Sequence, residues 1–85
     1  MRIDKYIKVS RILKKREDAK KLALNERLFI NGRVAKPSSE INVGDIVKVV
    51  FGNRIITFEV LEIRQTASKE QAFGMYKIIE ETKNN

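Results

Sequence analysis

Side chains that could bind phosphate groups are concentrated at the N-terminal end of this chain. Residues 1–36 carry twelve Lys or Arg against four acids, which gives this part a formal charge of +8. Residues 37–85 carry six against seven, a charge of −1, so the net +7 of the chain comes from its first part. This charge distribution is typical of proteins that bind polyanions, and nucleic acid is the first candidate.

The spacing of these cations indicates a shared surface. Three of them step by three, as along one stripe of a helix: Lys5, Lys8 and Arg11. A lysine pair and an arginine fall where a second helix would begin, and a helix start can bind phosphate. The arginine can contact a phosphate with two donors at once. We expect eight residues to bind RNA: Arg2, Lys5, Lys8, Arg11, Lys14, Lys15, Arg16 and Lys20. The alternative is a solvated basic face that only keeps the protein soluble.

The composition excludes several kinds of chemistry. The sequence has no Cys and no His, so it lacks thiolate ligands, disulfides and the commonest general base. It has no glycine-rich cofactor loop and no paired nucleophile and base, so we expect no catalytic residue, no cofactor and no metal. No apolar run approaches the roughly 18 residues of a membrane span, and the N-terminus lacks the apolar segment of a signal peptide. We therefore expect a cytoplasmic protein without a membrane partner.

The hydrophobic pattern predicts two helices that would position the cations. The spacing of Ile3, Tyr6 and Ile7 predicts a first helix over residues 3–9. A second helix is expected over residues 16–24, with its core face formed by Ala19, Leu22 and Ala23. The small alanines would allow the two helices to pack closely.

The hydrophobic pattern then changes from the period of a helix to that of strands. Asn31-Gly32 is a strong hairpin signal, because its turn needs positive φ at both residues. Strands are expected over residues 28–30, from 34 onward, over 46–51 and over 54–63. Residues 64–72 are polar and could be helical after Ser68, and periodicity does not decide whether residues 75–79 form a strand or a helical turn. Residues 83–85 are expected to fray.

The predicted fold class is therefore α+β, with two N-terminal helices packed on a small antiparallel β-sheet and a short C-terminal extension. Residues 1–50 would form the binding core. Residues 51–85 would complete the sheet as a β-hairpin and tail of the same single domain.

Several short motifs recur in the order and spacing of a known RNA-binding module. They are Arg2-Ile3-Asp4-Lys5-Tyr6-Ile7, Lys15-Arg16 with Ala19, Ile30-Asn31-Gly32 with Val34, Pro37-Ser38, and Val43-Gly44-Asp45-Ile46. On these motifs, residues 1–50 resemble the module named after ribosomal protein S-four. The resemblance implies the alpha-L motif, an RNA-binding surface made by two helices and braced by a small sheet.

Two positions depart from the pattern of that module. Lys15 stands where a Ser usually caps the second helix, so the side-chain cap is expected to be missing. The stretch Asn25-Glu26-Arg27 replaces the Gly that usually ends this helix. Because Asn tolerates positive φ, Asn25 is expected to make the C-terminal turn.

A narrower resemblance spans nearly the whole chain. It rests on the short form, on Lys14-Lys15-Arg16, on Val49-Val50-Phe51-Gly52 and on Met75-Tyr76-Lys77-Ile78. These features resemble the RqcP family of bacterial ribosome-associated quality-control factors, which is related to the fifteen-kilodalton heat-shock protein. The resemblance implies a non-catalytic partner of large-subunit rRNA and peptidyl-tRNA that acts with RqcH in alanine tailing of stalled chains. We expect a monomer and no binding to DNA.

By this resemblance Arg2 and Arg16 contact RNA, and the four lysines of the first helix and the junction support them. Asp4 could cap the first helix or orient a nearby Arg, or it could contact a partner directly. Tyr6 could pack in the core or stack on a base.

Other functions remain open. A ribosome assembly factor, or a heat-shock factor that recycles large subunits by binding rRNA, would share the same basic surface. A remnant of an RNA-modifying enzyme and a binder of anionic membranes are two further alternatives. The first of these is disfavoured because no catalytic half is present, and the second because the first helix has only a narrow apolar face.

Overall fold

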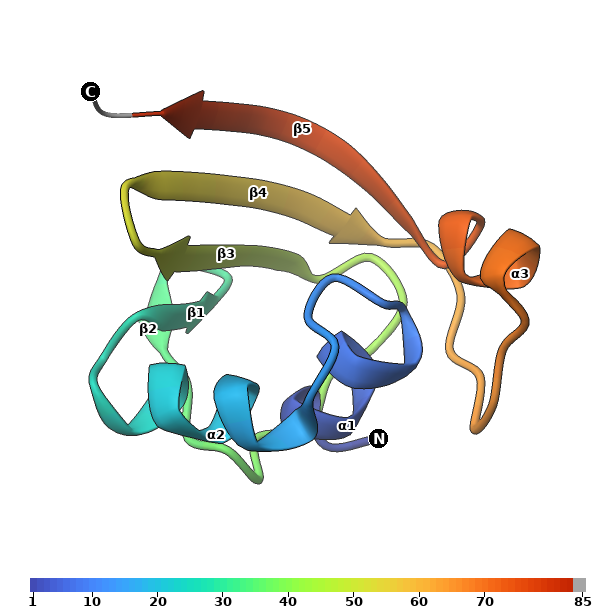
Figure 1. Cartoon of the computed structure of the whole chain (residues 1–85), viewed down its shortest axis with the longest axis horizontal. Coiled ribbons are helices and arrows are strands. Elements are labelled where there is room, and N and C mark those ends of the chain that lie inside the picture. The colour runs from blue at the N-terminus through green and yellow to red at the C-terminus, as the bar shows by residue number, and fades with distance from the viewer. Residues whose placement is uncertain (84–85) are drawn as a thin grey trace.

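The computed structural model describes residues 1–83 and has the predicted α+β fold. Its elements, in chain order, are α1 (Ile3–Val9), α2 (Arg16–Leu24), β1 (Leu28–Ile30), β2 (Arg33–Val34), β3 (Ile46–Phe51), β4 (Arg54–Val60), α3 (Lys69–Phe73) and β5 (Tyr76–Lys83). The strands form one sheet in the order β2-β1-β3-β4-β5, and all neighbours are antiparallel. Helices α1 and α2 lie together on one side of this sheet (Figure 1).

The C-terminal third of the chain departs from the prediction in its details. Strand β4 ends at Val60 instead of residue 63, because the N–H groups of Leu61 and Glu62 both turn to the carbonyl of Met75. The short helix α3 follows, with a capping box between Ser68 and Gln71. Strand β5 then pairs along β4 with one irregularity in register, so the segment after Met75 is a strand. Of the residues expected to fray, Lys83 ends β5 and residues 84–85 lie outside the described part.

The hairpin between β1 and β2 is confirmed in its backbone geometry. Asn31 and Gly32 have φ angles of +52° and +82°, as the predicted turn requires. The Asn31 side chain also accepts a hydrogen bond from Ile46 N–H at 2.9 Å and donates one to Asp45 at 3.1 Å. The same asparagine therefore makes the turn and fixes it against the start of β3.

The end of α2 corrects the expectation for Asn25. This residue keeps a negative φ of −97°, and it is Glu26 that takes the left-handed conformation, with φ of +58°. The N–H of Arg27 then reaches the carbonyl of Leu22 at 2.8 Å, and the N–H of Glu26 reaches that of Ala23 at 3.1 Å. These two bonds form a Schellman motif, which satisfies the last carbonyls of the helix without a glycine.

The core lies between the two N-terminal helices and the sheet. Its buried members come from α1, α2, β1, β3, β4, the loop after β2 and the segment before β5: they are Ile3, Tyr6, Ile7, Ala19, Ala23, Leu28, Ala35, Ile41, Val47, Val49, Ile56, Phe58, Val60 and Met75. Leu22, expected on the core face of α2, is only partly buried at its edge. Among residues 1–83 no helix combines the length and apolar character that crossing a membrane requires.

Tyr6 ties α1 to the C-terminal part of the core. Its side chain is fully buried, and its hydroxyl donates a 2.6 Å hydrogen bond to the carbonyl of Met75. Its ring stacks on Phe58 with the centroids 6.1 Å apart. Burial, followed by the nearby Tyr76 and Glu62, raises the pKa of the Tyr6 hydroxyl. Of the two interpretations of Tyr6, the structure supports the core residue, because a buried ring cannot stack on a base.

Replacing Tyr6 with Phe should lower the free energy of unfolding by about 1 kcal/mol, measured by urea denaturation. The loss should be at the low end for a buried hydrogen bond, because the Met75 carbonyl still accepts from Leu61 and Glu62. Tyr76→Phe, at a half-buried ring on β5, is the matched control and should change stability less.

The pH dependence provides a second check on Tyr6. The folded pKa is raised, so the unfolded chain releases this proton first, from a pH of about 10. Stability should therefore fall above pH 10 more steeply in the parent than in Tyr6→Phe. Identical high-pH slopes in the two proteins would contradict the buried neutral hydroxyl.

Candidate nucleic-acid interface

A buried carboxylate on α1 joins the starts of the two basic helices. Asp4 is fully buried, and its Oδ2 lies 3.2 Å from Nη2 of Arg2 and 3.2 Å from Nε of Arg16. Its Oδ1 accepts a 2.8 Å hydrogen bond from the N–H of Lys5. Arg2 is the residue before α1 and Arg16 is the first residue of α2. One carboxylate therefore contacts an arginine at each helix start and also accepts from a first-turn N–H of α1, so both structural roles considered for Asp4, helix capping and arginine orientation, have a contact in the structure.

The start of α1 is held from outside the helix. No capping side chain is present at Arg2 within the described residues. The N–H groups of Ile3 and Asp4 instead donate to the carbonyls of Ser39 and Pro37, at 2.8 and 3.3 Å. Because these are donors that a helix leaves unpaired at its start, the loop after β2 replaces a side-chain cap. This loop thereby fixes the position of Arg2 at the start of α1.

Both arginines retain donors for a ligand. A guanidinium has five N–H donors in a planar fork, and contact with Asp4 occupies only one side of it. The Arg2 and Arg16 side chains remain 45% and 37% exposed. Arg16 is more than an exposed cation, because it is also an ion-pair partner of a buried acid. Replacing Arg16 will therefore affect stability.

The stripe predicted along α1 is only partly correct. Lys5 and Lys8 lie on the helix, but α1 ends at Val9 and Arg11 lies beyond it with a left-handed φ of +63°. The Arg11 guanidinium donates a 3.4 Å hydrogen bond to the carbonyl of Ala67, and Nζ of Lys5 bonds to the side chain of Gln65. Lys5 on α1 and Arg11 after it therefore both contact the loop before α3.

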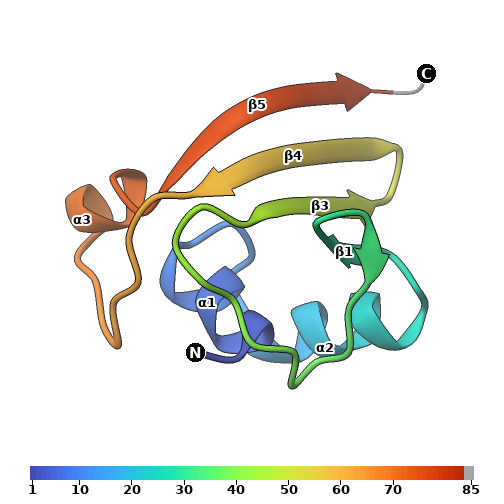
Figure 2. The same cartoon turned by 180° about the vertical axis from the view of Figure 1, so that it is seen from behind.

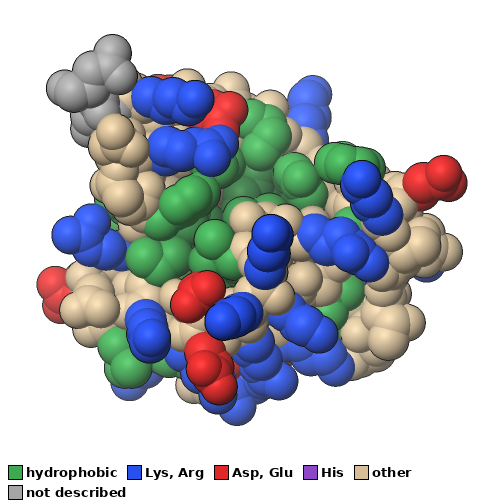
Figure 3. Space-filling view, in the orientation of Figure 1, with side chains coloured by type: hydrophobic (Ala, Val, Ile, Leu, Met, Phe, Trp, Pro, Cys, Tyr) green, Lys and Arg blue, Asp and Glu red, His purple; other side chains and the backbone are tan. Residues whose placement is uncertain are grey.

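The remaining predicted cations lie at the junction and on α2. Lys14 and Lys15 are exposed before α2, and Lys20 is half-buried one turn after Arg16. The missing cap at Lys15 is confirmed among the described residues. Figure 3 shows many Lys and Arg side chains over the lower part of the molecule, where α1 and α2 lie, and others over the strands above.

The sequence analysis missed the contribution of the C-terminal loop to this surface. The segment from Gln65 to Lys69 lies beside the end of α1, and the loop before α3 runs next to α1 in both views of the fold (Figures 1 and 2). Lys69 therefore joins the cations of the first helix. The possible helix after Ser68 was a signal for α3, but nothing in the spacing places it next to Arg11. In the described part of the chain no cluster of His, Cys, Asp and Glu is arranged to hold a metal ion.

Comparisons with known proteins assign this chain to a family. Residues 1–47 match the S4 domain. A protein of Streptococcus pneumoniae named RQC P-site tRNA stabilizing factor is 48% identical over 83 residues, which cover 98% of this chain and 94% of that protein. The chain belongs to the family of RQC P-site tRNA stabilizing factors. A Bacillus subtilis protein of the same name is 46% identical over 83 residues, covering 98% of this chain and 96% of its own length.

A solved structure shares the fold of this family member. Heat shock protein 15 of Vibrio cholerae, described as trimeric, superposes with a TM-score of 0.85. The match covers 92% of this chain and 80% of that chain, with 24% identical residues. It shows that this fold recurs in another protein.

Replacing Asp4 with Asn should lower the free energy of unfolding by about 1–3 kcal/mol, because the amide keeps the shape but loses both ion pairs. The cost should stay below that of a fully buried pair, since the two guanidinium groups can turn to water. Urea denaturation measures the change.

Asp18→Asn, at an exposed acid of α2, is the control for Asp4→Asn and should change stability by less than about 1 kcal/mol. Equal stabilities of Asp4→Asn and the parent would show that the carboxylate does not organise the helix starts.

Proposed function

We propose that this protein is a non-catalytic RNA-binding factor of ribosome-associated quality control in the cytoplasm. It binds large ribosomal subunits that carry peptidyl-tRNA and stabilises that tRNA. The observation that carries the proposal is the Asp4 carboxylate, which orients Arg2 and Arg16 on one basic surface. The names of the relatives from Streptococcus pneumoniae and Bacillus subtilis support the choice of substrate.

The eight cations identified from the sequence are the proposed RNA-binding residues, and Asp4 is their orienting residue. These eight residues lie within residues 1–50, and residues 51–85 complete the sheet that supports them. Contacts of this kind bind phosphates and recognise RNA by its shape, because exposed lysines do not discriminate bases. Structured rRNA and tRNA are therefore better ligands than a short single-stranded motif.

The proposal extends to the partners of this activity. Holding peptidyl-tRNA in place supports alanine tailing of the stalled chain by RqcH, which the resemblance to the RqcP family implies. The protein acts as a monomer, a state that light scattering in solution tests directly. The trimeric description of heat shock protein 15 applies to a chain that shares 24% of its residues.

Replacing Lys8, Lys14 and Lys15 together with Ala should weaken binding to large subunits carrying peptidyl-tRNA by roughly tenfold or more. Three phosphate contacts would be lost, and the slope of log K against log salt should become shallower by about 2–3. All three side chains are exposed, so the fold should be retained. Co-sedimentation at several salt concentrations measures both quantities.

The matched control replaces Lys48, Lys77 and Lys83, which are exposed lysines on the strands. This variant loses the same net charge and should bind like the parent. If both triple variants bind equally, the location of the charge does not matter and the proposed surface is wrong.

Capture of the tagged protein from cells should recover large-subunit rRNA, tRNA and RqcH, with little small-subunit RNA. The reason is that the proposed target is the split large subunit with its tRNA. RNA sequencing and mass spectrometry identify what is recovered. Recovery of immature rRNA with assembly proteins would instead favour an assembly factor that uses the same basic surface.

A further inference from the structure

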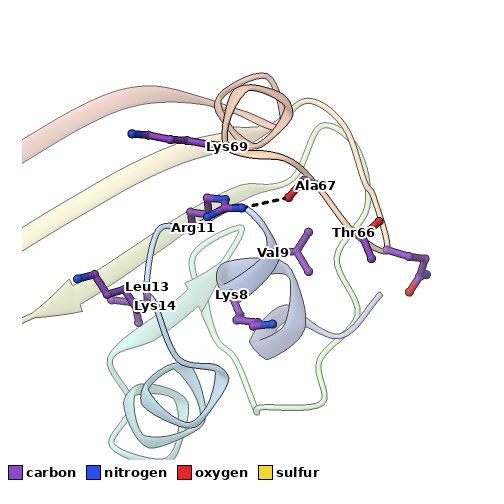
Figure 4. Close-up of a pocket in the computed structure, with 9 residues that line it drawn as sticks. Lys8, Val9, Arg11, Leu13, Lys14, Thr66, Ala67 and Lys69 are labelled. Carbon is purple, nitrogen blue, oxygen red and sulfur yellow. Dashed lines mark hydrogen bonds between the residues drawn. The ribbon is translucent and has the colours of Figure 1, made fainter.

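A groove separates the end of α1 from the loop before α3. It has a volume of about 580 Å³. One wall is formed by residues 8–14, which end α1 and lead to α2, and the other by residues 65–69. In the view of Figure 4, Arg11 lies between Lys69 of the second wall and Lys14 of the first. The groove therefore brings together two segments that are more than 50 residues apart in the chain.

The groove is positively charged on both walls. Four of the nine residues that line it are cations: Lys8, Arg11, Lys14 and Lys69. Among the described residues that line it, none is acidic. Like charges that line one groove repel one another, and an anion bound between them relieves that repulsion. The groove consequently has the electrostatics of an anion site.

The groove is already formed in the free protein. Arg11 takes a left-handed backbone conformation that is uncommon outside glycine, and its guanidinium bonds across the groove to the carbonyl of Ala67. Lys5 makes a second link to the same loop through Gln65. Unfavourable backbone conformations persist where the surrounding contacts determine them, and such positions often belong to binding sites.

The lining also indicates which part of a nucleic acid would fit. Val9, Leu13 and Ala67 provide apolar surface, and they pack at the edge of the core. No aromatic residue lines the groove within the described chain, so it lacks the platform on which unpaired bases stack. Cations beside a small apolar surface suit a sugar–phosphate strand. Lys8 and Lys14 also belong to the proposed RNA-binding surface, so the groove continues it.

We propose that this groove binds the phosphodiester backbone of an RNA strand and that Lys69 is a further RNA-binding residue. The inference rests on the proposed function and extends it beyond the S4 domain, which ends at residue 47. The low charge of the loop after β4 would suit a protein partner. In this proposal, the part of the loop that lines the groove contacts RNA instead. The strand belongs to rRNA or to tRNA, which share the same backbone chemistry.

Replacing Lys69 with Ala should weaken binding to large subunits carrying peptidyl-tRNA roughly threefold to tenfold. The salt slope should become shallower by about 0.7–0.9, as expected for one lost phosphate contact. Lys77→Ala is the matched control, because Lys77 is an exposed lysine of the same C-terminal segment on β5. It should bind like the parent.

A crosslink locates the ligand directly. The chain has no cysteine, so Thr66→Cys provides a single thiol for a photoactivatable crosslinker within the groove. The bound subunits should be crosslinked through RNA, and sequencing of the attached fragment distinguishes rRNA from tRNA. Thr82→Cys, exposed on β5, is the control and should give little RNA.

Parent-like binding by Lys69→Ala, with crosslinks from Thr66→Cys only to protein or to nothing, would overturn the inference. If Lys8, Lys14 and Lys15 remain necessary in that case, the groove proposal fails and the proposed function stands. If neither the triple variant nor Lys69→Ala weakens binding, both fail.

Discussion

A buried negative charge organises the positive surface of this protein. The Asp4 carboxylate lies in the interior and needs partners there, because an unpaired buried charge is strongly unfavourable. Its partners are Arg2 before α1, Arg16 at the start of α2 and the backbone of Lys5. The packing of the two helices and the presentation of their arginines therefore depend on the same group, so a change in one cannot leave the other unaffected.

The arrangement also moderates the repulsion that a dense basic surface creates. Concentrated like charge destabilises a compact state, and a charge of +8 lies within the first 36 residues. Asp4 offsets part of this repulsion from the protein interior. Because it is buried, its carboxylate does not compete with an anionic ligand at the surface. The acids of the strands lie elsewhere, as in the pair of Arg54 with Glu81 across β4 and β5. The outer part of the sheet is thus nearly neutral, and the helical side keeps its charge for a ligand.

The local sequence pattern was enough to predict the N-terminal elements. It could not predict contacts between residues that are distant in sequence. The bounds of α1, α2, β1 and β3 follow from hydrophobic period and from the Asn31-Gly32 turn, and both are local signals. The left-handed turn at Glu26 could not be read from propensity, since Asn25 is the better candidate by residue type. The meeting of Arg11 with Ala67 depends on how the loop before α3 packs, which no spacing along the chain encodes. For the same reason the sequence predicted the cations that cluster at its N-terminal end, but it did not predict that Lys69 lies beside them.

The hydrogen bond from Tyr6 to the carbonyl of Met75 bears on how this module could be transplanted. The segment that matches the S4 domain ends at residue 47, yet its core is closed by Ile56, Phe58, Val60 and Met75. A fusion carrying only the matched segment would expose the underside of both helices and leave the tyrosine hydroxyl without its acceptor. A host protein that borrows this RNA-binding surface must therefore supply its own replacement for β4 and the segment that returns to it. The portable unit is larger than the sequence signature by which it is recognised.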